Sequence, residues 1–445
     1  MPQYAQLDAA VYHASVAVGF LLLRAGNRQS TCYGHPHRAR HLTLLAVERQ
    51  NRAIQDTVNS IKTQGTIARQ PAADAMTLLL LFCIEALQGR EEEALRLMQR
   101  GIDALCFSDS TAATAGLDAQ LDRLRLQCGM FNAGGARAAL RVSMRAMARI
   151  HARVTAISSL DDARDELSDL IAAVQHTVSG SWKNPCDLQT GQRLTLEMAL
   201  DNWRMRFEQF VSAVPGWPSA VSSHDADTVC QLRLRERIAH VWLVDSPDGS
   251  EMVYDDDKYI HIFADIVDEA DRRRLQNKCC TGEASHDQHT AVAATTLPQP
   301  LFTFEMGYIP PLYWALLKCR SRELRRQLLT LLRRAPLQEG LWNRQIMMQV
   351  AEQVMAYEEA GRGEASISAP NLPSTAREQS PGHQHPRLLP KPALPPESAR
   401  IKVVQIGLRT TLASGLPGDR VQCFGRPRDI DGPLQLVLAF VATAS

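Results

Sequence analysis

Three acidic residues between positions 161 and 165 have the types and spacing of a magnesium site. Asp161, Asp162 and Asp165 form the string DDxxD. Clustered carboxylate oxygens suit a hard divalent cation, and a spacing of four places Asp161 and Asp165 on one face of a helix. A simpler role also fits, because Ser159 is a good N-cap and Asp162 completes a capping box at the positive end of the helix dipole. We favour the capping role.

Four residues near the N-terminus are of types that can bind zinc, namely Cys32, His35, His37 and His41. Their spacing fits no standard structural zinc site, and Pro36 suggests a loop. The adjacent thiols of Cys279 and Cys280 tend to diverge, which makes a shared metal geometry awkward. We therefore expect no metal, no cofactor and no catalytic residue in this chain.

Runs of like charge are expected to lie on solvated helix faces or at helix ends. The acidic run Asp255, Asp256 and Asp257 precedes an apolar-periodic segment, which favours a helix start over a cation site. Four basic clusters lie on predicted helices, at Arg233/Arg235/Arg237, Arg272 to Arg274, Arg320/Arg322/Arg325/Arg326 and Arg333/Arg334. Acids or apolar residues flank each cluster. This favours a solvated face over phosphate contact or a nuclear-import signal.

The composition excludes several classes of protein. The chain has 445 residues, and 49 Lys and Arg against 48 Asp and Glu give a net charge of +1. This balance argues against a basic nucleic-acid sleeve and against an acidic tail. With 45% hydrophobic residues, the chain can bury a large core and is expected to be a soluble globular protein. Phosphate-loop, GxSxG, HExxH and GxGxxG signatures do not occur in the sequence.

The cysteines and apolar runs suggest an intracellular chain. Ten cysteines are scattered without a CxxC pair, which favours reduced and mostly buried thiols. The apolar residues 16–23 follow polar residues rather than a positive start, so no signal peptide is expected. The longest apolar run, 78–84, is well short of the roughly 20 residues that cross a bilayer. We therefore expect no membrane span.

Helical periodicity dominates the chain up to about residue 360. Apolar residues recur at spacings of three and four in the windows 95–105, 160–174 and 196–210. Further helices are expected at 140–150, 229–242, 259–275, 312–332 and 342–359. Strand signals are rare before residue 400, and no strand-helix alternation occurs, so a parallel sheet is rejected. The predicted fold is all-α, with stacked antiparallel helices in a repeat-like order over residues 1–360.

The character of the chain changes after this helical part. Eight prolines with Ser, Gly and His predict a flexible linker or loop over 361–398. Beyond it, 401–406 and 434–441 are rich in β-branched and apolar residues, with turn chemistry at 415–418 and 425–432. We expect a small β-containing tail over 399–445, docked on the helices.

The segment 302–359 has the most specific pattern in the chain. It contains, in this order, Pro310-Pro311-Leu312, Cys319-Arg320, Arg325-Arg326, Glu339-Gly340-Leu341-Trp342 and Glu358-Glu359. This order resembles the regulatory half of fungal-specific transcription factors of the binuclear zinc cluster class. The resemblance covers about 400 residues, including a helix pair over 12–22 and 45–54 and a buried helix over 78–89.

The resemblance implies a nuclear transcription regulator from a fungus that controls a metabolic gene cluster without catalysis. Other transcription proteins would be its partners, as a homodimer or heterodimer, and grooves between helices would accept a partner helix or a small effector. The six-cysteine cluster that binds zinc and DNA in this family does not occur in the chain. Promoter DNA would therefore be reached through a partner, or through a zinc-containing module outside this sequence.

Two alternatives stay open at the level of sequence. The first is a magnesium-dependent all-α prenyl-diphosphate enzyme built on Asp161, Asp162 and Asp165. The second is a non-catalytic cytosolic scaffold with no role in transcription. Exposed acids at a helix start would argue against the first, and promoter occupancy would argue against the second.

Overall fold

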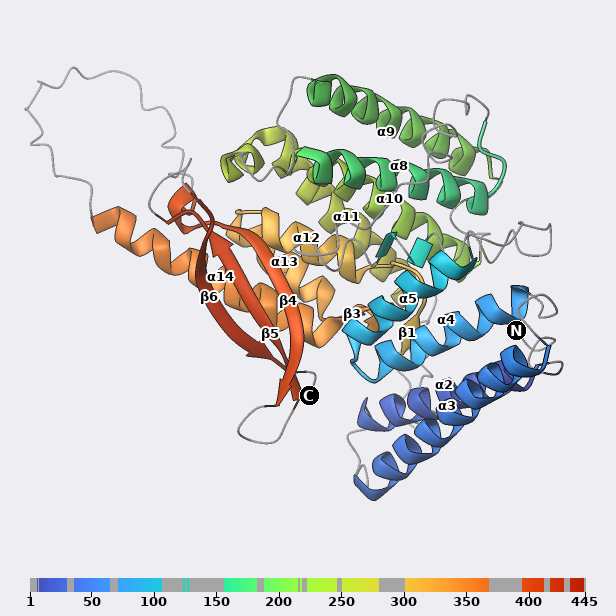
Figure 1. Cartoon of the computed structure of the whole chain (residues 1–445). Helices are drawn as coiled ribbons and strands as arrows, with labels where there is room; N and C mark the ends of the chain where they lie inside the picture. The colour runs from blue at the N-terminus through green and yellow to red at the C-terminus, as the bar shows by residue number, and fades with distance from the viewer. Residues whose placement is uncertain are drawn as a thin grey trace, which may run out of the picture.

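The computed structural model describes most of the chain. The described residues are 6, 8–29, 36–64, 71–105, 123–124, 126–127, 156–181, 188–214, 217, 222–245, 250–279, 301–367, 394–411, 417–427 and 433–443. The helix expected at 140–150 lies outside them. Within the described part the chain is mostly helical, with a small sheet of three strands at the C-terminal end (Figure 1). The predicted mostly α-helical fold with a β-containing tail is confirmed.

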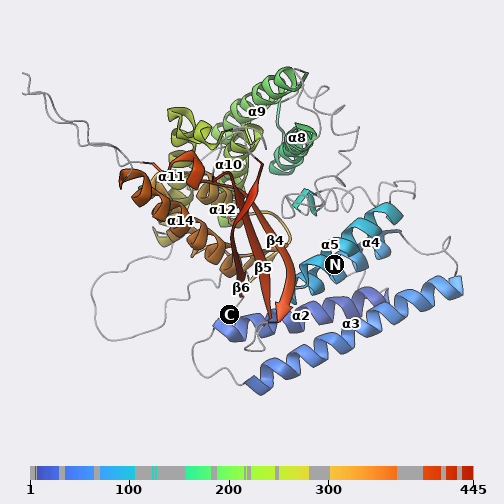
Figure 2. The ribbon, with the colours of Figure 1, turned by 60° about the vertical axis from the view of Figure 1, so that its left-hand side comes forward.

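Within the described residues, four helices build the N-terminal part. These are α2 (Ala9–Gln29), α3 (Pro36–Gln64), α4 (Pro71–Leu87) and α5 (Glu91–Leu105). Helices α2 and α3 form an antiparallel pair, and α3 lies at the edge of the molecule (Figure 2). Small residues on one face of α2, among them Ala14 and Ala17, are completely buried. Their small side chains let the neighbouring helices approach closely, and the expected helix pair is confirmed.

Helix α2 is also apolar over a considerable length. Among the helices that the structure describes, one 18-residue window, Ala9–Gly26, is long and apolar enough to cross a membrane by length and composition alone. The sequence analysis weighed only the run 78–84 as a membrane span and missed this window, and the expectation that the chain crosses no membrane stays a prediction. A core helix and a signal sequence would both pass the same test. In the structure, Val11 and Leu21 of this window are buried in a cluster with residues of α3 and α4.

The central part contains the two longest predicted apolar stripes. Its elements are α8 (Leu160–Ser181), α9 (Leu188–Ala213), α10 (Ser223–Leu243), the 3-10 helix η1 (Glu251–Asp255) and α11 (Asp257–Cys279). Leu167 and Val174 of α8 and Trp203 and Phe207 of α9 are buried in the main core. The Trp203 ring stacks on Phe207 with centroids 4.7 Å apart and donates a hydrogen bond of 3.1 Å to the Ala163 carbonyl. Both stripes therefore face the core as predicted.

The segment after residue 300 is more broken than predicted. It contains β1 (Phe302–Thr303), α12 (Ile309–Lys318), α13 (Arg322–Leu332), β2 (Gln338–Glu339), β3 (Trp342–Asn343) and α14 (Arg344–Ile367). The single helix predicted at 312–332 is wrong, because Cys319 ends α12 in an extended conformation. This break lets the side chains of both Lys318 and Arg320 enter the protein interior. Helix α14 starts at Arg344 rather than at Trp342, which belongs to β3.

Glu339 fixes the start of α12. Its carboxylate accepts hydrogen bonds of 2.9 Å from the backbone N–H groups of Gly307, Tyr308 and Ile309. These donors lie at a helix N-terminus, where a carboxylate is favourable. A Cβ atom on Gly307 would lie 2.6 Å from Glu339 Oε1, so only glycine fits. Gly340, which follows, has a φ of +56°, a conformation that glycine adopts at little cost.

The buried carboxyl group of Glu339 is expected to make the stability of the protein depend on pH. Burial raises the pKa of Glu339 to about 7, although the three N–H donors act to lower it. Between pH 4.5 and 7 the folded chain then binds more protons at this site than the unfolded chain, so stability falls as the pH rises. We expect wild type to lose up to about 3 kcal/mol relative to Glu339→Gln over this interval. Urea unfolding of both proteins at pH 5 and pH 7.5 tests this, and an unchanged difference would contradict it.

The C-terminal tail forms one antiparallel sheet in the order β4-β5-β6. Its strands are β4 (Ile401–Thr411), β5 (Pro417–Gly425) and β6 (Gln435–Ala442), and the 3-10 helix η2 (Glu397–Ala399) precedes them. The outer strands were predicted, whereas β5 was not, because its first residues read as a turn. Val421 of β5 pairs with Ile406 on one side and Phe440 on the other. The middle strand β5 thus pairs with both outer strands and sets their register.

The sheet is docked on the helices, as expected. Val421, Cys423 and Ala442 are completely buried and belong to the same core as α14. Gln349 of α14 donates to the Thr443 carbonyl and accepts from the Thr443 N–H, at 2.8 and 2.9 Å. The predicted linker boundary at 361 is too early, since α14 continues to Ile367. Residues 368–393 of that linker lie outside the described residues.

Candidate functional site

The DDxxD acids lie at the start of α8. The N–H of Asp162 donates a 3.1 Å hydrogen bond to Ser159 Oγ, which confirms Ser159 as the cap. Asp161 is 80% exposed and pairs with Arg164 at 2.7 Å, and Asp165 lies 3.5 Å from Arg123. Arginines thus pair with Asp161 and Asp165, and Asp162 accepts from the Ser158 hydroxyl, so the geometry gives the magnesium hypothesis no support.

The acidic run at 255–257 divides between two roles. Asp256 caps α11, since its carboxylate accepts a 2.9 Å hydrogen bond from the N–H of Lys258, and Asp257 is the first residue of that helix. The same role was expected for Asp255 and is wrong. Asp255 instead pairs with Arg400 at 2.5 Å and connects η1 to the tail.

The residues with zinc-ligand chemistry do not form a described site. His37 and His41 are exposed on α3, and the loop expected around Pro36 is wrong because α3 begins there. Cys32, His35, Cys280 and the side chain of Cys279 lie outside the described residues. Four described cysteines, Cys83, Cys230, Cys319 and Cys423, are buried and free, as expected. Burial raises the pKa of Cys230 to about 12, so this thiol stays protonated.

The basic clusters contain the largest error of the sequence analysis. Arg272, Arg322, Arg326, Arg333 and Arg334 are exposed, as predicted. Arg235, Arg273, Arg320 and Arg325 are instead buried. Arg274 lies outside the residues with described side chains. A buried guanidinium requires a counter-charge, and three of these four arginines have one within hydrogen-bond distance.

Arg320 and Arg325 belong to a buried charge network with Lys318, Asp245, Glu251 and Glu358. Lys318 Nζ lies 3.0 Å from Asp245 and 2.8 Å from Glu251, and Arg320 lies 3.0 Å from Glu251 and 3.4 Å from Glu358. Arg325 also donates to Glu358. Burial acts to raise the pKa of Glu358, but Arg320 and Arg325 outweigh it and hold the pKa below its usual range. These two arginines therefore favour the ionised form of Glu358.

The buried charge network also holds the tail. The N–H of Ile401, at the start of β4, donates a 2.8 Å hydrogen bond to Glu358. The N–H of Glu251 donates at the same distance to Glu397 of η2, and Arg400 donates to the Glu251 carbonyl at 2.9 Å. Charged residues of the segment 302–359 that could suggest catalysis thus join helices to the sheet.

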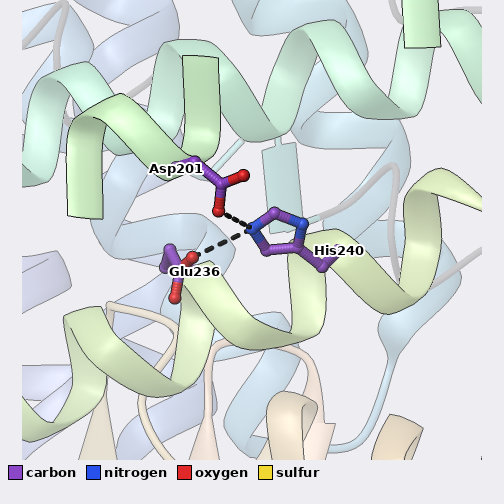
Figure 3. Close-up of side chains that lie close together, drawn as sticks. All are labelled: Asp201, Glu236 and His240. Carbon is purple, nitrogen blue, oxygen red and sulfur yellow. Dashed lines mark hydrogen bonds and ion pairs between the residues drawn. The ribbon is translucent and has the colours of Figure 1, made fainter. Parts of the chain in front are cut away.

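A second polar cluster, on α9 and α10, has ligand chemistry. Asp201, Glu236 and His240 each offer one ligand atom, and these atoms lie within 4.8 Å of one another (Figure 3). His240 Nε2 lies 3.0 Å from Glu236 and 3.7 Å from Asp201. Glu236 and His240 are buried, whereas Asp201 is exposed. An imidazole with two carboxylates is a donor set that zinc accepts.

Arginine already provides a cation at this cluster. Arg204 pairs with Asp201 at 2.7 Å and lies 3.8 Å from Glu236. The arrangement is therefore satisfied by protein groups alone. Sequence analysis missed the cluster, although Glu236 and His240 are four residues apart on one helix face. The third residue, Asp201, is brought to them only by the packing of α9 on α10.

Comparisons with known proteins give no further indication. No protein-family model matches the chain, no curated protein matches it, and no solved structure matches it.

Proposed function

We propose that this chain is the regulatory part of a transcription regulator that acts through protein contacts, as the resemblance of segment 302–359 implies. The packing of that segment supports the proposal. Its charged residues Arg320, Arg325, Glu339 and Glu358 are all buried and hold elements together. A polar pattern of this kind would otherwise suggest catalysis. Here the buried charged residues have a structural role in joining elements of the fold. We therefore look for the functional contacts on the surface of the protein.

One surface carries the proposal. The outward face of α3 exposes Leu44, Val47, Ile54 and Val58, with exposed fractions between 36% and 69%. Together with the exposed Asn51, they follow spacings of 3, 4, 3 and 4 along the helix. This is the spacing of a helix seam that packs against another helix. We name these five residues the α3 stripe.

The α3 stripe fits a second copy of the same chain. Leu44 and Val58 lie seven residues to either side of Asn51, so two antiparallel copies that cross at Asn51 would place Leu44 opposite Val58. Val47 and Ile54, four and three residues from Asn51, would then lie within one residue of the same level along the seam. The Asn51 amide both donates and accepts, and can therefore pair with its own copy. Beside the stripe, Glu48 and Arg52 form an exposed pair of opposite charge at 2.7 Å. Across a two-fold axis each would face the other, which gives charge complementarity.

Ile54→Glu is expected to break this dimer. It would place a carboxylate in the apolar seam of each copy, and the dissociation constant should rise at least about tenfold, or 1.4 kcal/mol. Light scattering of the purified chain over a concentration series measures this. Met205→Glu, an exposed position on α9, is the control and should leave the molar mass unchanged. A wild type that stays monomeric, or an Ile54→Glu variant that stays dimeric, would show that this surface does not self-associate.

Promoter occupancy tests the function itself. Chromatin immunoprecipitation of the tagged protein in the organism that encodes it should enrich a defined set of promoters. Deletion of the gene should change transcripts of the same genes. A scaffold outside transcription would give neither result. Unchanged transcripts together with a solely cytoplasmic protein would reject the proposal.

A further inference from the structure

Three arginines from separate parts of the chain meet at one carboxylate. Arg123 lies 2.7 Å from Glu305, and Arg164 of α8 lies 3.2 Å from it. Arg235 of α10 approaches the same carboxylate to 4.0 Å. Glu305 itself lies between β1 and α12. Three guanidinium groups thus surround a single acid, which can present only two oxygen atoms.

Arg235 is the least satisfied of the three. It is 4% exposed, and its Nε has no hydrogen-bond partner. Within the described residues its one ion pair is with Glu305, at a distance too long for a hydrogen bond. Burial lowers the pKa of Arg235 to about 10, and the other two arginines contribute to the shift. The Nε of this buried guanidinium is therefore short of an acceptor.

The other acids nearby do not supply the missing contact. Asp161 pairs with Arg164 but is 80% exposed, and Asp165 is 3.5 Å from Arg123 at the rim of the cluster. The charge of Glu339 acts to raise the pKa of Arg235, but its carboxylate is held by the three N–H groups at the start of α12. Among the described acids, Glu305 is the one that approaches all three arginines to 4.0 Å or less.

We propose that Arg123, Arg164 and Arg235 form a binding site for a small dianion, a phosphate group or a dicarboxylate, which Glu305 occupies in the absence of that ligand. A phosphate group has three free oxygen atoms and can accept from three guanidinium groups at once. The Glu305 side chain is 27% exposed, so it can turn toward solvent when the ligand enters. Its backbone is held meanwhile by the Thr303 hydroxyl, which donates to the Glu305 carbonyl at 3.1 Å.

Glu305 then acts as an internal competitor for the site. Glu305→Gln removes the competing charge and should bind inorganic phosphate at least tenfold more tightly than wild type. Isothermal titration of the purified full chain at constant ionic strength, with chloride as the balancing anion, measures both affinities. A parallel titration with malonate distinguishes the two candidate ligands. If phosphate binds more tightly than malonate, the ligand is a phosphate group, and if malonate binds more tightly, the ligand is a dicarboxylate.

Arg235→Met provides the decisive comparison. Methionine keeps an unbranched side chain without the buried charge, and such replacements are tolerated in protein interiors. Combined with Glu305→Gln, Arg235→Met should weaken anion binding at least tenfold. Arg204→Met on α9, combined with the same substitution, should leave the anion affinity unchanged. If Glu305→Gln does not fold, Glu305→Asp is the substitute, because its shorter side chain moves the carboxylate away from the arginines. It is expected to bind phosphate more tightly than wild type. Absence of saturable binding to the folded variant, or binding unaffected by Arg235→Met, would overturn the site. Neither result depends on the proposed role in transcription.

Discussion

Replacing Glu358 by alanine is expected to lower the free energy of unfolding by about 3 to 5 kcal/mol. Glu358 is completely buried, and Arg325 and the Ile401 N–H both donate to it. Without the carboxylate, Arg320 and Arg325 lose a counter-charge where water cannot replace it. The first residue of β4 also loses its contact with α14. The sheet should therefore become less protected than the helices.

The neighbouring residue is a matched control. Glu359 pairs with Arg322 at 3.6 Å, and the Arg322 side chain is about half exposed. Such pairs contribute little, so Glu359→Ala should change stability by no more than about 0.5 kcal/mol. Urea unfolding gives both values, and hydrogen exchange reports the protection of β4. Similar losses for the two variants would mean that the buried charge network does not hold the tail.

Trp203→Ala is expected to destabilise the helical part by about 3 to 5 kcal/mol. The indole is completely buried against Phe207, so its removal leaves a large cavity between α8 and α9. It also leaves the Ala163 carbonyl without the 3.1 Å hydrogen bond that the indole donates. Both effects act in the same direction.

Met205 of the same helix is the control for this substitution. It is 58% exposed, and Met205→Ala should lower stability by less than about 0.5 kcal/mol. Thermal unfolding of the two variants beside wild type measures the difference. A small loss for Trp203→Ala would mean that the stripe of α9 does not face the core.

The regular helices could be predicted because their signal is local. Spacings of three and four place Leu167, Val174, Trp203 and Phe207 on single faces, and all four are buried. The cap at Ser159 was equally local, since its partner is three residues away. Elements of this kind depend on neighbours in the sequence, which a pattern can report.

The strand β5 and the break after Lys318 were missed because their causes lie far away in the chain. β5 pairs with β4 and β6 on both sides, which outweighs the turn propensity of its first residues. Lys318 and Arg320 turn inward toward Glu251, which lies 67 and 69 residues earlier. The local sequence around a basic cluster does not show acidic partners so far away in the chain. The cluster that contains Arg320 was therefore predicted to lie on the surface.

The candidate sites were hidden for the same reason. Arg123 and Glu305 are 182 residues apart, and packing alone brings them together. Asp201 joins Glu236 and His240 through the contact of α9 with α10. The DDxxD string, by contrast, was conspicuous in the sequence and caps a helix. Local patterns reported structural roles here, while the ligand chemistry arose from tertiary contacts.

The proposed function places contact surfaces, rather than an active site, at the centre. The most direct test tethers the chain to a reporter promoter through a heterologous DNA-binding module in fungal cells. The wild-type fusion should change reporter output relative to the module alone, Ile54→Glu should abolish that change at equal abundance, and Met205→Glu should retain it. A nuclear and abundant wild-type fusion that leaves the reporter at the level of the module alone would contradict the account.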